Sequence, residues 1–214
     1  NLVATAIAAY PLSRPSFGPR RFFNFFIAFT MYFSGGMIPS YLLNTSLGFY
    51  NSRWVMIIPG LLSTYNVMVC RSAFSAIPDE VIESAQIDGA NDWQTFGRIA
   101  VRLITPTLAV LTLYYGVGHW NSYFNALIYI QDRAKYPLQV FLREILVQGK
   151  FAEQLLQSGI SLSEEDIAKL YNQSKTADMI KYGVIVVSTV PMMIIYPWMQ
   201  KFFAKGVMIG SVKG

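Results

Sequence analysis

Long uncharged runs alternate with short charged segments along this chain of 214 residues. Four runs lack Lys, Arg, Asp and Glu altogether: Phe22–Asn51, Trp54–Cys70, Leu103–Gln131 and Tyr182–Gln200. Each approaches or exceeds the roughly 17–25 apolar residues with which a helix crosses a bilayer. The runs are too evenly apolar for the alternating strands of a membrane barrel. The pattern therefore predicts an all-α membrane protein.

The basic residues orient the expected spans. The loop with Arg14, Arg20 and Arg21 holds no acid, and neither does the tail after residue 200. The positive-inside tendency places both in the cytoplasm. Residues 71–102 are then cytoplasmic, and residues 131–178 are external. The expected spans are Phe22–Leu43 outward, Trp54–Cys70 inward, Leu103–Ile130 outward and Tyr182–Met199 inward.

The apolar piece Leu2–Leu12 is too short to span alone. We expect it to be the cytoplasmic end of a span whose beginning is missing, since the first residue is Asn rather than Met. A signal peptide fits less well because no basic segment precedes this piece. We expect residues 1–214 to form a single transmembrane domain.

The external segment 131–178 has a helical pattern of its own. Pro137 suits the first turn of a helix, and Ser163 followed by three acids predicts the capped start of a second, short helix. The basic residues of this segment oppose the positive-inside tendency, but long translocated segments follow it less strictly. The apolar positions at helical spacing are Leu138, Phe141, Leu142, Ile145 and Leu146.

Composition agrees with the membrane interpretation and excludes several kinds of chemistry. Only 14% of the residues are charged, against about a quarter in soluble domains. The net charge of +5 does not indicate nucleic-acid binding, because no basic patch with stacking aromatics is present. Cys70 is the only cysteine, so no internal disulfide can form.

Catalytic and metal-binding motifs are missing from the sequence. The only histidine is His119, which excludes a multi-histidine metal site, and Gly149-Lys150 lacks the rest of a Walker motif. We therefore expect no catalytic residue, metal site or cofactor in this chain. The spans also lack the Asp or Glu that ion-coupled transporters usually place there, which argues against secondary transport.

The charged loop 71–102 is the most informative segment. Pro78 and the acids after it favour a helix start. Val81, Ile82, Ala85 and Gly89 share one helical face, which predicts a narrow stripe of small residues for contact with a partner. Gly89 suits a turn with positive φ, and Asn91 can cap a second helix.

The pattern Glu83-x-Ala85-x-x-Asp88-Gly89-Ala90 resembles the cytoplasmic loop of permease subunits in binding-protein-dependent ATP-driven (ABC) importers, in their carbohydrate-uptake branch. Two positions depart from the family pattern: Ser84 replaces an alanine, and Val101-Arg102 replaces Leu-Pro. Arg102 therefore suggests a continuous helix from the loop into the next span. Further matching motifs stand in the family's order: Arg71–Phe74, Ile77-Pro78, Pro106, Trp120-Asn121, Tyr196-Pro197, Gln200–Phe203 and the end from Lys205 to Gly214.

This resemblance implies a helix-bundle permease with about six spans in the full chain, in the cytoplasmic membrane of a bacterium or archaeon. It implies partnership with a second permease, two ATPase subunits that bind ATP and Mg²⁺, and an external solute-binding protein. The loop would dock on the ATPase: Glu83 by hydrogen bonds, Ala85 and Gly89 by their fit, Asp88 by stabilising the turn, with Ala90 beside them.

Aromatic and amide groups gather in the third uncharged run, where they suit sugar recognition. Helix packing and interfacial belts explain the same residues equally well. The candidate pathway residues are Tyr115, His119, Trp120, Asn121, Tyr123 and Asn125.

Close packing is the expected role of Gly35-Gly36 and of Gly116 with Gly118, and a hinge or a broken helix is the alternative. Pro59 and Pro191 are expected to kink their spans. Alternative functions are a permease for a non-sugar solute, an ion-coupled transporter and a non-transporting scaffold.

Overall fold

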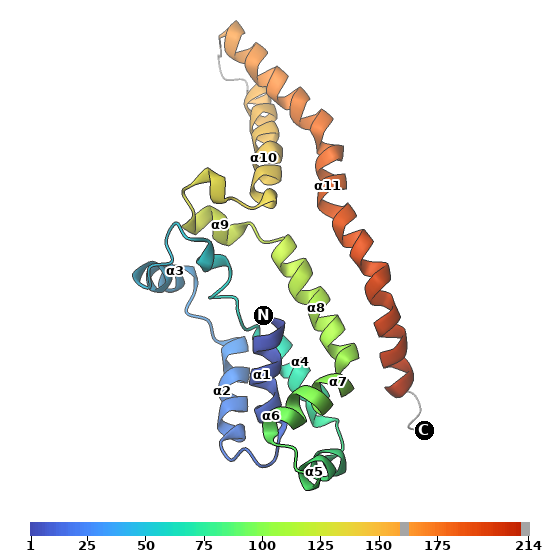
Figure 1. The fold of residues 1–214 in the computed structure, drawn as a ribbon. Helices are drawn as coiled ribbons and strands as arrows, with labels where there is room; N and C mark the ends of the chain where they lie inside the picture. Colours follow the sequence, from blue (N-terminus) through green and yellow to red (C-terminus); the bar gives the residue numbers. More distant parts are fainter. Residues whose placement is uncertain (159–162, 211–214) are drawn as a thin grey trace.

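The computed structural model describes residues 1–158 and 163–210, and these form an all-helical chain (Figure 1). The model confirms the predicted fold class. The helices are α1 (Leu2–Ser13), α2 (Arg20–Tyr32), α3 (Met37–Ser46), η1 (Arg53–Met56), α4 (Thr64–Ser75), α5 (Asp79–Ile87), α6 (Asp92–Gln94), η2 (Thr95–Ala100), α7 (Val101–Leu103), α8 (Thr105–Trp120), α9 (Phe124–Tyr129), η3 (Arg133–Lys135), α10 (Leu138–Gln157) and α11 (Glu164–Gly210).

The main core lies where α1, α4 and α8 meet. Ala9 on α1 and Cys70 and Phe74 on α4 are completely buried there, together with Ala100 and Leu111. Small side chains on α1 allow the α4 backbone to approach closely, as they do in other membrane helix pairs. α2 lies beside these helices in Figure 1. The buried Cys70 occupies an apolar position in this core.

The first uncharged run is not a continuous span. α2 and α3 meet at an angle of 118°, and Gly36 between them has a φ of +89°. α2 has already ended at Tyr32, and Gly36, the residue that caps the start of α3, has a backbone conformation that only glycine adopts without strain. The packing role expected for Gly35-Gly36 is therefore wrong at this place, and the alternative of a broken helix is what the structure shows.

The second run is also shorter as a helix than predicted. Only its end lies in α4, which starts at Thr64 behind a Ser63 cap whose hydroxyl accepts from the Asn66 amide. The part from Trp54 to Leu62 forms a 3₁₀ turn and irregular backbone. Pro59 lies in this irregular stretch, so it breaks the run rather than kinking a helix.

A bend of 80° separates the loop helices from α8. Ile104, at the junction, has φ −95° and ψ 13°, and α8 follows with Pro106 in its first turn. The continuous helix expected from Arg102 is therefore wrong, because the break occurs at the residues before Pro106. The third run also divides, since α8 ends at Trp120 and α9 begins at Phe124.

α10 and the first half of α11 form a helical hairpin that projects beyond the bundle (Figure 1). Pro137 precedes the first residue of α10, as predicted. The Ser163 hydroxyl accepts from the Asp166 amide, which confirms the predicted cap. The second helix is not short, however. α11 continues without a break from Glu164 through the fourth uncharged run, with Pro191 inside it.

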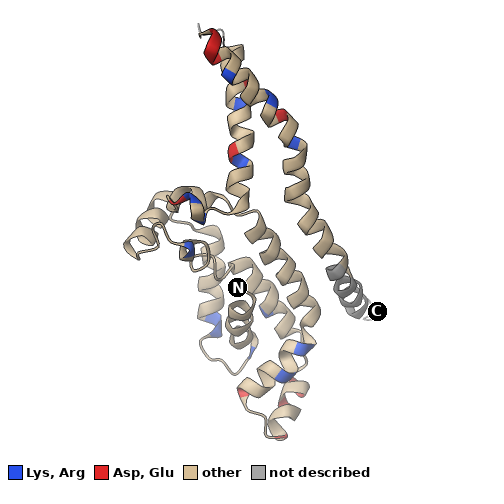
Figure 2. Ribbon diagram, turned by 45° about the horizontal axis from the view of Figure 1, so that its top comes forward, with Lys and Arg blue, Asp and Glu red and all other residues tan. Residues whose placement is uncertain are grey.

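Charged residues occupy both ends of the structure, and the middle is nearly free of them (Figure 2). Among the described residues, one helix is long and apolar enough to cross a membrane, and up to three spans result if each bent pair counts as one. The apolar middle between charged ends is the distribution that a bilayer favours.

Gly149 fixes the spacing of the hairpin. It is buried on α10, and a Cβ placed there would overlap the Ala177 Cβ on α11. We expect Gly149→Ala to lower the free energy of unfolding by about 1–3 kcal/mol through overpacking, measured as thermal unfolding of the purified protein. Gly183→Ala is the control, since open space surrounds Gly183. Equal melting temperatures for the two variants would contradict close packing at Gly149.

Candidate functional site

α5 packs against the bundle by one face. Ile82 is 7% exposed and Ala85 is 5% exposed, and Ile82 belongs to the main core with Phe74 and Ile77. Asp79 and Glu80 occupy the first turn, where negative charge favours the helix dipole. The face predicted to be a contact stripe for a partner therefore contacts the chain itself, and little of Ala85 is left for another protein.

A tight turn joins α5 to α6. Gly89 has a φ of +85°, and its amide donates to Gln86 O at 3.0 Å, while the Ala90 amide donates to Ala85 O at 2.9 Å. These two bonds close the carboxyl end of α5 in the manner of a glycine cap. The positive φ predicted for Gly89 is confirmed.

Asn91 starts the next helix through a reciprocal cap. Its Oδ1 accepts from the Gln94 amide at 2.8 Å, and Gln94 Oε1 accepts from the Asn91 amide at 2.9 Å. Such a capping box satisfies two amides that the helix leaves unpaired. The cap predicted for Asn91 is confirmed, and with the Gly89 turn it makes the α5–α6 connection a defined shape.

The outer face of this connection combines acids with two large apolar side chains. Glu83, Asp88 and Gly89 are exposed, while Ile87 is 86% exposed and Trp93 is 71% exposed. The sequence interpretation missed both apolar residues. Ile87 lies seven residues after Glu80 and four after Glu83, so an apolar residue on an acidic helix face was the available signal.

Arg14 ties this loop to the bundle. Its side chain is 8% exposed, and its guanidinium donates to the carbonyl of Phe74 at the end of α4 and to Ser13 Oγ at 3.1 Å. It also lies 3.5 Å from Asp79 Oδ1 at the start of α5, and above the ring of Tyr10. One buried cation thus joins the ends of α1 and α4 to the start of α5.

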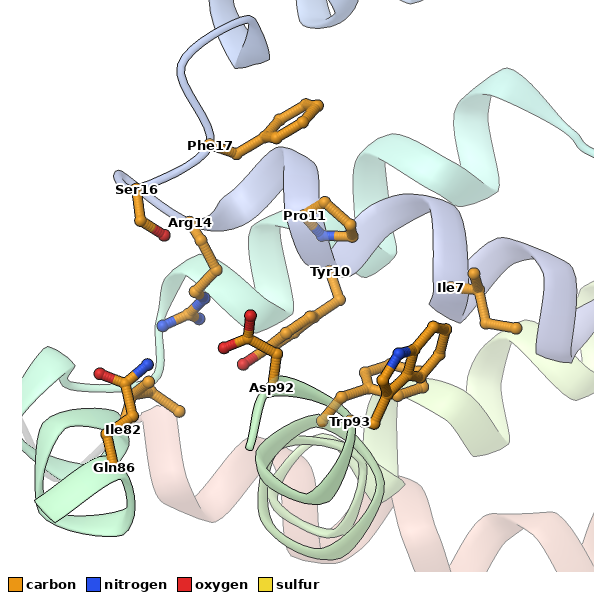
Figure 3. A pocket seen from close by; sticks show the side chains of 11 residues that line it. Ile7, Tyr10, Pro11, Arg14, Ser16, Phe17, Ile82, Gln86, Asp92 and Trp93 are labelled. Atoms are coloured by element: carbon orange, nitrogen blue, oxygen red, sulfur yellow. The ribbon is translucent and has the colours of Figure 1, made fainter. Parts of the chain in front are cut away.

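A hollow of about 490 Å³ lies beside this contact, between the end of α1 and the helices α5 and α6. Figure 3 shows Arg14 and Asp92 gathered near Tyr10, with the Trp93 ring beside them. The wall is mostly apolar and aromatic. Beside the hollow, α5 contacts η2 and buries Ile82 and Ala85.

Three of the candidate pathway residues on α8 make contacts within the chain. The Tyr115 hydroxyl lies 2.7 Å from Thr5 Oγ1 and accepts from the Ser63 amide at 3.1 Å. Trp120 Nε1 donates to Ser188 O on α11 at 2.8 Å, and His119 Nε2 lies 3.0 Å from Asn1 Oδ1. These bonds join helices, which is the packing role left open by the sequence.

The other three candidates lie beyond the end of α8. Tyr123 lies under the Arg143 guanidinium, 5.1 Å from ring centroid to Cζ. Asn121 and Asn125 are exposed. The six residues therefore have separate surroundings along α8 and α9.

The chain is similar to known transport proteins over nearly its whole length. Residues 2–209 match the family model described as "Binding-protein-dependent transport system inner membrane component". The chain is 39% identical over its full length, and over 71% of the relative, to the polygalacturonan/rhamnogalacturonan transport system permease protein YtcP of Bacillus subtilis. It is 23% identical to the arabinooligosaccharides transport system permease protein AraQ of Halalkalibacterium halodurans, covering all of this chain and 68% of the relative.

A solved structure shows the same arrangement of helices. It is the crystal structure of a bacterial ABC transporter involved in the import of the acidic polysaccharide alginate. The TM-score is 0.78 at 34% sequence identity, over 94% of this chain and 68% of the compared chain.

Proposed function

Because the chain belongs to the family of binding-protein-dependent transport system inner membrane components, we propose that it is the permease subunit of an ATP-driven importer for acidic oligosaccharides. The observation that supports this substrate class is the similarity, at 39% and 34% identity, to a polygalacturonan/rhamnogalacturonan permease and to an alginate importer. Galacturonan and alginate are polymers of sugar acids, so a carboxylate on the sugar ring is the shared chemical feature.

In this proposal, ATP hydrolysis by a partner subunit supplies the free energy for transport. The α5–α6 connection within the coupling loop, residues 71–102, docks on an ATPase subunit, which binds ATP and Mg²⁺. Ile87 and Trp93 provide apolar contact area, and Glu83 accepts charge-assisted hydrogen bonds. Gly89 allows the partner to approach the turn, Asp88 and Ala90 complete the turn, and Ala85 holds α5 on the bundle.

Movement passes from the loop to the spans through Arg14 and Ile82. Arg14 joins α5 to the ends of α1 and α4, and Ile82 packs in the same core. A displacement of α5 by the ATPase therefore shifts α1 and α4 together. Rigid-body rearrangement of this kind is the usual basis of alternating access.

The two charged ends of the structure support an orientation in the membrane, and with it a place for the binding protein. The α10–α11 hairpin, within residues 131–178, lies at the end opposite to α5 (Figures 1 and 2). We assign the α5 end to the cytoplasm and the hairpin to the outside, where a solute-binding protein docks. A second permease and two ATPase subunits complete the importer in the cytoplasmic membrane.

Uptake by the reconstituted importer tests the proposed substrate. Proteoliposomes with both permeases, the ATPase and the binding protein are given oligogalacturonates or neutral maltooligosaccharides. We expect ATP-dependent uptake of the acidic sugars and little uptake of the neutral ones. Uptake of the neutral sugars alone would contradict the proposal.

Ile87 tests the docking surface. We expect Ile87→Asp to weaken ATPase binding about tenfold or more, since burial of such a side chain contributes about 1.5–3 kcal/mol. The measurement is the amount of ATPase that co-purifies with the tagged permease. Phe151→Asp is the matched control, because Phe151 is also exposed, at 59%, but lies on the hairpin at the other end. Equal ATPase recovery with both variants would place the docking surface elsewhere.

A further inference from the structure

A second hollow, of about 500 Å³, lies at the foot of the hairpin, between the η1 turn and the segment that leads into α10. Its wall includes Arg53, Trp54, Asp132 and Lys135. The hollow is open to solvent rather than enclosed. In the orientation assigned above, this hollow opens at the outer surface, below the surface proposed for the binding protein.

The backbone around this hollow is fixed by Asn51. This residue has a φ of +51°, which is uncommon for a residue with a side chain. Its Oδ1 accepts from the amides of Gln131 and Asp132 at 3.2 and 3.1 Å, and its own amide donates to Tyr129 O at 2.8 Å. Two segments eighty residues apart in sequence are therefore held together.

Lys135 neutralises the acid in the wall. Its ammonium donates to Asn51 O at 3.0 Å and lies 3.5 Å from Asp132 Oδ2. Asp132 Oδ1 in turn accepts from the Ala134 amide at 3.0 Å. The charges of Lys135 and Asp132 therefore offset each other, and both side chains are held by local hydrogen bonds. The charge of Arg53 is left as the net positive charge of the hollow.

Arg53 has donors to spare. Its Nη2 donates to Ala134 O at 3.1 Å, and within the described residues no carboxylate lies within 4 Å of its guanidinium. A guanidinium held by one bond still offers the paired N–H groups that match a carboxylate. Trp54, the next residue, is 60% exposed and presents an aromatic face, on which the apolar face of a sugar ring can stack.

We propose that this hollow binds one sugar-acid residue of the incoming saccharide, with the carboxylate on Arg53 and the ring on Trp54. The assignment rests on the proposed function, because an acidic saccharide supplies a carboxylate and a stacking ring in one ligand. The hollow provides the importer with a site for the substrate at the outer surface, before the spans themselves. An anionic lipid headgroup shares the charge but not the stacking ring, and the test separates the two.

The test compares trigalacturonate with its methyl ester, which keeps the rings and removes the charges. Uptake by the complete importer is measured as a function of the concentration of loaded binding protein. We expect Arg53→Gln to raise the half-saturation concentration for trigalacturonate about tenfold and to change that for the ester by less than about twofold. The wild-type and Arg53→Gln importers are tested with the same binding protein. Its own preference for acid or ester therefore cancels when the two importers are compared.

Two further variants complete the design. Arg133→Gln is the matched control, because Arg133 is paired with Glu144 at 2.7 Å and lies over Phe141; its values should equal those of the wild type. Trp54→Ala should raise the half-saturation concentration for both substrates by a similar factor, because stacking does not depend on the charge.

The outcomes distinguish the site from the function. Wild-type uptake of trigalacturonate with an unchanged acid-to-ester ratio in Arg53→Gln would overturn the site and leave the importer function intact. An unaltered Trp54→Ala variant would overturn the stacking contact, and an equal effect of Arg53→Gln on the acid and the ester would favour a lipid headgroup. Failure of the wild type to take up trigalacturonate at all would overturn the proposed substrate and the site with it.

Discussion

The substitution Gly89→Val is expected to reduce ATP-driven uptake at least about tenfold, while the protein remains folded in the membrane. Gly89 has a φ of +85°, and a β-branched side chain in this left-handed region costs about 1–2 kcal/mol or more. The chain leaves open space around Gly89, so in the docking proposed above a side chain there would also project toward the ATPase. The measurement is the ratio of sugar transported to ATP hydrolysed in proteoliposomes.

Two controls separate strain from bulk at this turn. Gly89→Asn keeps a residue that tolerates left-handed backbone, and we expect it to retain more of the coupling than valine. Gly97→Val places the same side chain on the same loop, where the glycine has open space and no positive φ. Uptake of Gly89→Val at the wild-type level would remove the turn from the coupling mechanism.

Arg14→Met is expected to have the second large effect. The substitution removes the donor to the Phe74 carbonyl, and a buried acceptor left without a partner costs roughly 1–3 kcal/mol. It also removes the bond that joins the end of α1 to the end of α4, so transport should fall more than stability alone explains. Thermal unfolding and the transport-to-hydrolysis ratio of the purified importer are measured together.

Asp79→Asn is the matched control for Arg14. Asp79 is the other half of the ion pair, but its side chain is 64% exposed, and exposed pairs contribute only about 0–1 kcal/mol. We therefore expect Asp79→Asn to melt and transport nearly as the wild type does. If Arg14→Met behaved like Asp79→Asn, the buried contacts of Arg14 would have no role in coupling.

The local features of the coupling loop were predictable because they depend on neighbouring residues. A positive φ at Gly89, a cap at Asn91 and a helix start after Pro137 each follow from the chemistry of one residue and its next turn. Burial of Ala85 and exposure of Ile87 were not predictable in this way. They depend on where the bundle lies relative to α5, and the spacing of residues in the helix leaves that open.

The spans show the same limit. Hydropathy reports the free energy of placing residues in lipid, and it contains no information on where a helix bends or breaks. The break at Gly36 and the bend at Ile104 therefore lay inside runs that read as continuous. Tyr115 is a similar case in the candidate pathway. Its hydroxyl is hydrogen-bonded to Thr5 and Ser63, which are distant in sequence, so only the fold shows these partners.

The unbroken course of α11 has a mechanical consequence. The stretch from Glu164 to Pro197 has 34 residues, about 51 Å at 1.5 Å per residue, whereas the hydrocarbon layer is about 30 Å thick. Some 20 Å of the same rod therefore stands outside the lipid, stiffened by α10. The outer tip of α11 is then about 35 Å from the middle of the bilayer, so a rotation of about 10° around that middle moves the tip by about 6 Å. In the arrangement proposed above, the binding protein docked on the tip would therefore be displaced whenever the buried half of α11 tilts.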